Sequence, residues 1–226
     1  MTIPLVIVGA GGLGREVAEL VRALIAVGPA AGRSTSLPVH LAGFLDDDPR
    51  THGSLVGGSP VLGDVGWLDG RPDVAVTVGI ASPGDPGARG RLVRRLGQRR
   101  WTTLVHPSVD LPDSIVIGEG SIVHAGSVLT ADVSIGSHVV VMPSVVMTHD
   151  DVVGDGSIFG SGARLAGGVS VGRSAYIGSG ASIREGLRIG DGAVVGMGSV
   201  VTSDVPPGEV WAGVPARRLR GPGVHS

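Results

Sequence analysis

The stretch VHPSVDLPDSIVIGEGSIVHAGSVLTADVSIGSHVVVMPSVVM, residues 105–147, carries an apolar residue at every sixth position, and the spacing continues without a slip to Val201. The seventeen residues at these positions, called anchors below, are Val105, Leu111, Ile117, Val123, Leu129, Ile135, Val141, Met147, Val153, Phe159, Leu165, Val171, Ile177, Ile183, Ile189, Val195 and Val201. With 42% hydrophobic residues in the chain, chance would give such a run with a probability under about one in a million. The six-residue spacing is therefore a property of the fold.

This repeat predicts an all-β left-handed parallel β-helix over residues 105–216. Each hexad would form one short strand and one turn, and three hexads would close a triangular coil whose anchors point inward and stack on one another. We take the handedness from the repeat signature, because crossovers between parallel strands are ordinarily right-handed. A β-sandwich would need apolar residues at every second position, which is not the spacing seen here.

Residues 1–104 follow another pattern, in which strands alternate with helices. Strands are expected at 4–8, in the segment ending with GFLDDD (43–48), at 73–79 and at 101–105, with helices at 15–26 and 86–100 and a polar loop at 28–38. Such alternation is typical of a small Rossmann-like parallel α/β sheet. After the β-helix, residues 217–226 are expected to form a C-terminal tail.

Composition excludes several classes of protein. The chain has 226 residues and 40 glycines, but a hydrophobic content of 42% and a net charge of −2 argue against disorder. The near-neutral charge also argues against nucleic-acid binding. The absence of cysteine excludes disulfides, thiolate metal sites and a cysteine acyl-enzyme. No apolar run is long enough for a membrane span, and the first residues do not read as a signal peptide, so we expect a cytoplasmic protein.

The motif Gly9-x-Gly11-x-x-Gly14 follows a predicted strand and opens a predicted helix, as a phosphate-binding loop requires. Helix N-terminal amides would stabilise the phosphate charge, and Asp46 and Asp47 would accept hydrogen bonds from a ribose or a base. The alternative is a tight turn with a solvated acidic loop. Because 1–104 supplies only one mononucleotide-binding half, a nucleoside diphosphate carrying another group is favoured over NAD.

Titratable residues are scarce in the hexads, and the run His149-Asp150-Asp151 stands out at an expected coil corner. Histidine is a suitable general base at neutral pH, and a neighbouring carboxylate would orient it. The residues alone leave a plain surface histidine equally open. His106 and His124 should stack on adjacent coils in a structural role, because Met142 takes the next place in their column and a metal site needs three ligands. No metal is expected, which disfavours a zinc hydratase or lyase.

His138 has no acidic neighbour in the sequence. We interpret it as a surface histidine.

Together these segments resemble the sialic acid O-acetyltransferase and UDP-amino-sugar N-acetyltransferase family of bacterial glycan pathways, the NeuD and PglD type. The resemblance covers nearly the whole chain. Its motifs are GAGGLGREV (9–17), GFLDDD (43–48), GGSPVLG (57–63), LVHPS (104–108), THDDVVGDGS (148–157), ARLAGGVSVG (163–172) and GVPARRL (213–219).

The resemblance implies a homotrimer in which acetyl-CoA lies between adjacent β-helices and a nucleotide-activated amino sugar binds residues 1–104. His149 would be the general base, Asp150 its carboxylate partner and Gly167 the oxyanion donor. The sugar nucleotide would contact Gly11, Gly12, Leu13, Gly14, Asp46, Asp47 and Gly79. The coenzyme would contact Ile158, Gly167, Ser179 and Met197.

Three positions depart from the family pattern. Leu13, Met142 and Ile158 stand where the family usually has histidine, asparagine and histidine. The main hypothesis is transfer of an acetyl group from acetyl-CoA to an amine of a nucleotide-linked sugar. The alternatives are a sugar O-acetyltransferase, or a sugar-nucleotide-binding protein in which acyl transfer is altered or lost.

Overall fold

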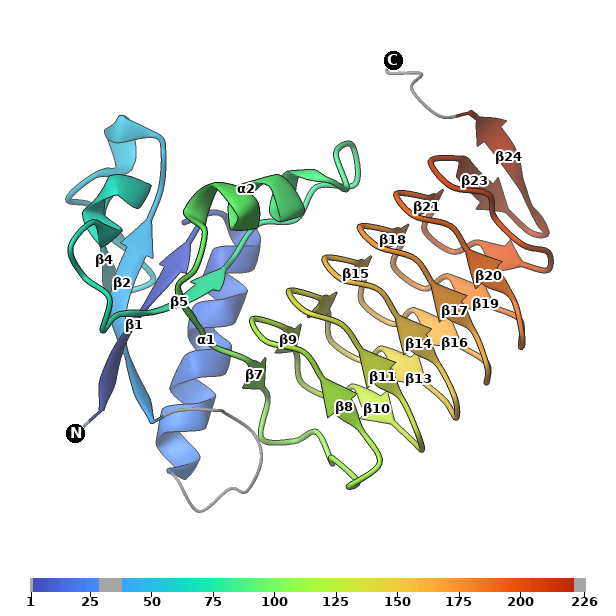
Figure 1. The fold of residues 1–226 in the computed structure, drawn as a ribbon, viewed down its shortest axis with the longest axis horizontal. Coiled ribbons are helices and arrows are strands. Elements are labelled where there is room, and N and C mark those ends of the chain that lie inside the picture. Colours follow the sequence, from blue (N-terminus) through green and yellow to red (C-terminus); the bar gives the residue numbers. More distant parts are fainter. Residues whose placement is uncertain (1, 29–37, 222–226) are drawn as a thin grey trace.

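The computed structural model describes residues 2–28 and 38–221, arranged as an α/β sheet followed by a β-helix (Figure 1). The α/β part contains β1 (Ile3–Val8), α1 (Gly12–Val27), β2 (Val39–Leu45), β3 (Leu55–Val56), β4 (Ser59–Gly63), β5 (Ala75–Val78), α2 (Ala88–Leu96) and β6 (Arg100–Trp101). The strand order is β3-β4-β2-β1-β5-β6, parallel except for the β3–β4 hairpin. The predicted parallel α/β sheet is confirmed, and the predicted polar loop lies almost wholly outside the described residues.

The segment 101–105, predicted as a single strand, serves two sheets. Trp101 ends β6, where it pairs with Val76 of β5. Leu104 and Val105 form β7, the first strand of the β-helix, and pair with β9 (Ile122–Val123). Between them the Thr103 hydroxyl donates to the carbonyl of Gly118 at 3.1 Å. The segment 101–105 is therefore the crossing between the two parts of the chain.

Apart from its last two strands, the β-helix is built from two-residue strands on three parallel sheets. One sheet holds β10 (Val128–Leu129), β13 (Val146–Met147), β16 (Arg164–Leu165), β19 (Ser182–Ile183) and β22 (Val200–Val201). The second holds β8 (Val116–Ile117), β11 (Ser134–Ile135), β14 (Val152–Val153), β17 (Ser170–Val171) and β20 (Arg188–Ile189). The third runs through β7 (Leu104–Val105), β9, β12 (Val140–Val141), β15 (Ile158–Phe159), β18 (Tyr176–Ile177) and β21 (Val194–Val195) to β23 (Val210–Gly213) and β24 (Ala216–Arg220).

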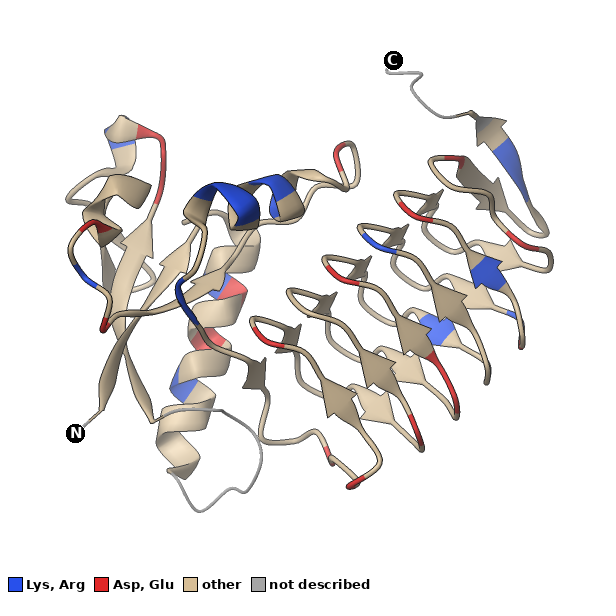
Figure 2. Cartoon of the chain, in the orientation of Figure 1, with Lys and Arg blue, Asp and Glu red and all other residues tan. Residues whose placement is uncertain are grey.

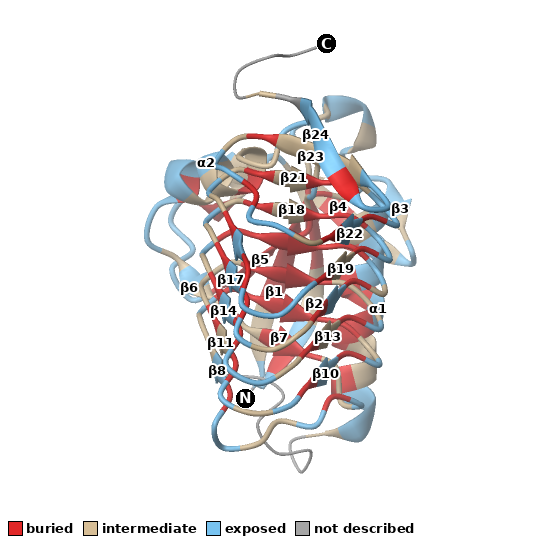
Figure 3. Cartoon of the chain, turned by 90° about the vertical axis from the view of Figure 1, so that its right-hand side faces the viewer, coloured by how far each residue is buried: buried red, intermediate tan, exposed pale blue. Residues whose placement is uncertain are grey.

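The anchors form the core of this β-helix. Strands pair with partners three hexads away, as Val141 does with Phe159, so equivalent anchors stack from coil to coil. The anchors are buried except Leu111 and Ile117, which pack partly buried against the same cluster near its first coil. Figure 3 shows this buried interior flanked by exposed corners. The hexad prediction of a β-helix is thus confirmed.

The corners explain the glycine content. The third residue after an anchor has a positive φ throughout the regular coils, and it is usually glycine, as at Gly168 with a φ of 71°. A side chain there is strained, yet Asp150 adopts the same conformation with a φ of 62°. At the residue directly after an anchor the next coil passes close by, so a Cβ on Gly118 would lie 2.5 Å from the carbonyl carbon of Gly136.

The β-helix ends in an antiparallel pair, β23 and β24. Residues 217–220, predicted as the start of a tail, belong to β24, and 222–226 lie outside the described residues. Neither of the two helices in the described chain has the length and apolar character to cross a membrane.

Candidate functional site

The corner between β13 and β14 presents His149 to solvent. The His149 Nδ1 lies 2.9 Å from Oδ2 of Asp150, and both side chains are 68% exposed. This contact fixes the orientation of the imidazole and turns its Nε2 atom away from the carboxylate. Within the described residues Nε2 has no hydrogen-bond partner, so it is available to a reacting group.

Gly167 lies beneath this imidazole. It follows His149 by one full coil, and the amide of Gly168 donates to the carbonyl of His149 at 2.8 Å. A Cβ built on Gly167 would be 2.3 Å from both Cε1 and Nε2 of the imidazole, so the ring covers the α-carbon. The Gly167 amide donates to no acceptor in the described part of the chain. The structure thus brings together His149, Asp150 and Gly167, the three residues predicted to be catalytic.

Asp151, at the same corner, has no role of its own in the sequence prediction. Its side chain is 0% exposed, and its two oxygens accept the amide of Thr148 at 2.8 Å and that of Val169 at 2.9 Å. Burial raises the pKa of its carboxyl to about 6, while the two amides and His149 act to lower it and Asp150 adds to the rise. An acidic residue among core-facing positions is the signal that identifies it.

Of the residues predicted to contact the coenzyme, Gly167 lies at this corner, and the other three lie elsewhere on the β-helix. Ser179 and Met197 follow β18 and β21, so they stack along a different edge from His149; the amide of Gly198 donates to the Ser179 carbonyl at 2.8 Å. Ser179 is exposed, and Met197 is 81% exposed. Ile158 is only 2% exposed within this chain. One chain therefore does not assemble Ser179, Met197 and His149 into a single site.

The glycine loop between β1 and α1 is a compact turn. A Cβ on Gly14 would lie 1.9 Å from the carbonyl oxygen of Gly9, and a Cβ on Gly79 would lie 2.7 Å from the α-carbon of Gly14. Hypothetical Cβ atoms on Gly11 and Gly12 meet nothing within 4 Å. No side chain among the described residues caps the N-terminus of α1, so its first amides lack a capping partner, in the arrangement that binds phosphate.

Residues next to this loop shape it from within the protein. The Asp46 carboxylate accepts the amide of Ala10 at 2.9 Å and that of Asp48 at 3.0 Å. Asp47 forms an exposed ion pair with Arg95 at 3.0 Å. Leu13 packs partly buried against the core of the α/β part. Asp46 thus ties the end of β2 to the glycine loop, while Asp47 would have to share Arg95 with a ligand.

No hydrogen bond or ion pair of the described residues joins the glycine loop to the His149 corner. The two candidate half-sites are separate within one chain.

The remaining histidines have structural surroundings. His124 is 5% exposed, and its pKa is lowered to about 4 by burial and secondarily by His106. Its Nε2 has no hydrogen-bond partner, whereas Nδ1 of His106 contacts Ser108 Oγ at 2.9 Å. Across the ranges 2–28 and 38–221 no three histidine or acidic side chains are grouped so that they would hold a metal ion.

The interpretation of His138 as a surface histidine is wrong. Its ring is half-buried and packs edge-on against Trp101, with centroids 4.7 Å apart. Burial and the nearby Arg89 lower its pKa to about 4, although Asp155 acts in the opposite direction. The α/β part covers this corner, which the hexad pattern alone does not reveal.

Arg89, on α2, connects the two parts of the chain. It is 1% exposed, and its Nε donates to the carbonyl of His138 at 2.6 Å, while Nη1 donates to that of Val78. Nη2 reaches the carbonyl of Gly120 at 3.4 Å. No carboxylate pairs with it in the described residues, and burial lowers its pKa to about 9. Figure 2 shows α2 as a basic helix beside the β-helix. Arg89 thereby holds the end of β5, next to Gly79, against the first coils.

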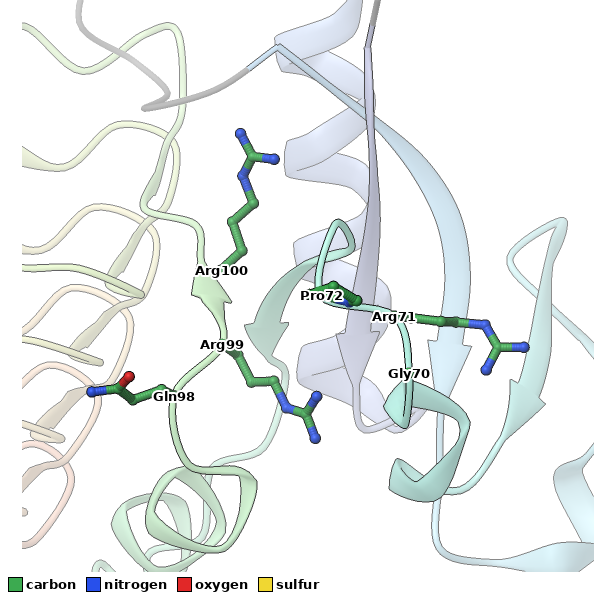
Figure 4. A pocket seen from close by; sticks show the side chains of 6 residues that line it. All are labelled: Gly70, Arg71, Pro72, Gln98, Arg99 and Arg100. Carbon is green, nitrogen blue, oxygen red and sulfur yellow. The ribbon is translucent and has the colours of Figure 1, made fainter.

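A separate cavity of about 440 Å³ lies at the N-terminal ends of β5 and β6, the end of the sheet opposite the glycine loop. It is lined by Gly70, Arg71, Pro72, Gln98, Arg99 and Arg100 (Figure 4). Its guanidinium groups point in different directions. Arg71 stacks on Trp67 at 4.4 Å, and Arg99 donates to the carbonyl of Leu68 at 3.2 Å. These side chains do not converge on a ligand.

Comparison with protein families matches two segments of the β-helix. Residues 168–203 match the bacterial transferase hexapeptide (six repeats) family, and residues 109–131 match the hexapeptide repeat of succinyl-transferase. Comparison with curated proteins gave no match.

Solved structures match over nearly the whole chain. The acetyltransferase domain of PglB from Neisseria gonorrhoeae is 31% identical with a TM-score of 0.82, over 96% of this chain and 100% of that chain. PerB from Caulobacter crescentus, solved in complex with CoA and GDP-perosamine, is 33% identical with a TM-score of 0.82, over 96% and 97% of the two chains. WeeI from Acinetobacter baumannii is 32% identical with a TM-score of 0.79, over 96% and 100%.

Proposed function

The chain belongs to the hexapeptide-repeat sugar acetyltransferases of the NeuD and PglD type, and on that premise we propose that it transfers an acetyl group from acetyl-CoA to an amine of a nucleotide-linked sugar. The observation that carries this proposal is the His149 imidazole, which Asp150 orients and which covers the α-carbon of Gly167, a residue whose amide is unpaired within the described residues. Among the relatives, the PglB domain binds acetyl-CoA and PerB binds CoA together with GDP-perosamine.

The chemistry follows from these three residues. The Nε2 of His149 takes a proton from the sugar amine as its nitrogen attacks the thioester carbonyl. The Gly167 amide donates to the oxygen of the tetrahedral intermediate, where negative charge develops. Collapse of the intermediate breaks the carbon–sulfur bond, and CoA leaves as a thiol after receiving the proton from His149. Asp150 keeps the imidazole in the required tautomer and stabilises its charged form.

The sugar nucleotide would bind at the glycine loop. The open amides at Gly11 and Gly12 suit a diphosphate, and the close packing of Gly14 against Gly79 leaves the backbone near the ligand. Asp46 would act by shaping the loop, and Asp47 by contacting the ribose or the base in competition with Arg95. Leu13 would lie beside the sugar.

The complete site would be built between chains of a cytoplasmic homotrimer. In one chain His149 stands on a different edge of the β-helix from Ser179 and Met197, and it is separate from the glycine loop. A second chain would supply the missing edge, with acetyl-CoA between Gly167 of one chain and Ser179 and Met197 of the other. Ile158 is buried within one chain, so it would reach the coenzyme only after a local rearrangement.

The proposal is tested by incubating the protein with acetyl-CoA and a panel of nucleotide-linked sugars that carry either an amine or only hydroxyls, and measuring CoA release. Release with amino sugars alone supports the proposal. Release with hydroxyl sugars would indicate an O-acetyltransferase. Calorimetric binding of the nucleotide without binding of acetyl-CoA would indicate a binding protein that has lost acyl transfer.

A further inference from the structure

The fourth residue after each anchor is buried throughout the β-helix. From Val109 to Val205 every such residue is valine, isoleucine, leucine, alanine or serine, with Asp151 as the one exception. Asp151 is 0% exposed and forms no ion pair within the described residues. A buried carboxylate is costly unless its oxygens are hydrogen-bonded, and Asp151 makes these hydrogen bonds differently from the serines at equivalent positions.

Serine at this position makes a simple link between coils. Ser121 accepts the amide of Val139, one coil further along, at 2.9 Å and donates to the carbonyl of Gly136 at 2.8 Å. Asp151 makes the corresponding link to the amide of Val169 with Oδ1, but its second oxygen accepts the amide of Thr148 in its own corner. The carboxylate therefore makes a contact that serine is too short to make.

This second contact changes the backbone beside His149. At the equivalent positions, Thr130, Ala166 and Arg184 donate their amides to the anchor carbonyl of the next coil, at 3.0–3.2 Å. Thr148 instead donates its amide to the Asp151 carboxylate at 2.8 Å. Its hydroxyl donates to the carbonyl of the anchor Leu165 at 3.1 Å. Asp151 thus hydrogen-bonds to Thr148, just before His149, and to Val169, two residues after Gly167.

We propose that Asp151 is a positioning residue, which holds the corner carrying His149 in register with the corner carrying Gly167. The inference rests on the proposed function, in which the imidazole and the Gly167 amide must act on the same thioester carbonyl. Displacing a catalytic group by about 1 Å can lower a rate by about a hundredfold. Asp151 is 0% exposed and so lies out of reach of either substrate; its loss should affect turnover rather than binding.

The test compares Asp151→Ser with Ser121→Ala. Serine occupies several equivalent positions in this chain, such as Ser121. At 151 it keeps an acceptor for the Val169 amide and removes the acceptor of the Thr148 amide. Ser121→Ala removes a buried link between coils at a corner without His149. Rates are divided by the number of coenzyme sites counted by calorimetry with acetyl-CoA, so that misfolded protein does not count as lost turnover.

Asp151→Ser is expected to lower kcat about tenfold or more with KM for both substrates within about twofold, and Ser121→Ala to leave kcat unchanged. Hydrogen exchange of the peptide spanning residues 148–169 is expected to quicken in Asp151→Ser only. An unchanged kcat in Asp151→Ser, or an equal fall in both variants, overturns the inference. If wild-type protein transfers no acetyl group to any acceptor, the proposed function fails. Hydrogen exchange of the 148–169 peptide then decides the positioning role alone: an unchanged rate in Asp151→Ser overturns it, and a quicker rate supports it.

Discussion

The imidazole of His149 covers the α-carbon of Gly167 so closely that a methyl group on Gly167 would lie 2.3 Å from the ring. The two residues are one coil apart in a regular β-helix, and the Gly168 amide to His149 carbonyl bond fixes their backbones together. Because neither backbone is free to shift, a side chain at 167 must displace the imidazole.

Gly167→Ala should therefore lower kcat about a hundredfold while keeping the backbone amide that would stabilise the oxyanion. The fold should persist, since the ring stands at an exposed corner and can swing into solvent. Steady-state CoA release measures the effect, and thermal unfolding is the control. Wild-type turnover in a folded Gly167→Ala variant would show that the imidazole acts from another position.

The glycine loop predicts a separable effect on nucleotide binding. A Cβ at Gly14 would lie 1.9 Å from the Gly9 carbonyl oxygen, so Gly14→Ala must open the turn. We expect affinity for the nucleotide sugar to fall about tenfold or more, with affinity for acetyl-CoA unchanged, by calorimetry. Gly84→Ala is the matched control, because its Cβ would meet only Ser82 Oγ at 3.9 Å. Equal nucleotide affinity in Gly14→Ala and Gly84→Ala would place the nucleotide elsewhere.

The buried carboxyl of Asp151 predicts a pH dependence of stability. Burial raises its pKa from 3.8 to about 6 in the folded chain, so its contribution to stability is full below about pH 4 and is lost as the pH rises through 6. The unfolding free energy of wild type minus that of Asp151→Asn should fall by about 3 kcal/mol between acid and neutral pH. Urea unfolding of both proteins at each pH measures this difference. A difference that is constant, or that rises with pH, would contradict the assignment.

Two arginines of α2, the buried Arg89 and the exposed Arg91, are expected to contribute differently to the free energy of unfolding. Arg89→Met leaves the carbonyls of Val78 and His138 without their donor and should cost about 3 kcal/mol. Arg91→Met removes only an exposed pair with Asp85 and should cost less than about 1 kcal/mol. Denaturant unfolding compares the two variants. Similar costs would mean that the buried guanidinium does not hold the two parts of the chain together.

The anchors could be predicted from the sequence because the β-helix repeats one environment with one period. Each anchor such as Val141 or Phe159 meets the same neighbours, so spacing alone places it in the core. The glycine loop could be predicted equally well, because a short local turn requires Gly9, Gly11 and Gly14.

Contacts between distant segments had no such signal. The burial of Arg89 and His138 depends on how the α/β part rests on the first coils, which neither segment encodes alone. The segment 101–105 could not be divided between two sheets from its composition, because β-branched and aromatic residues favour a strand at both of its ends. Asp151 was visible as an exception to the hexad pattern, but its two amide partners could be known only once Thr148 and Val169 were placed.

The proposed role of His149, removal of the proton from the acceptor amine, is measured by CoA release from wild-type protein and His149→Ala. Both are assayed at saturating acetyl-CoA and the best amino-sugar acceptor of the panel. We expect kcat of His149→Ala to fall by about a hundredfold or more, with unchanged affinity for acetyl-CoA. Equal turnover by the two proteins would contradict it.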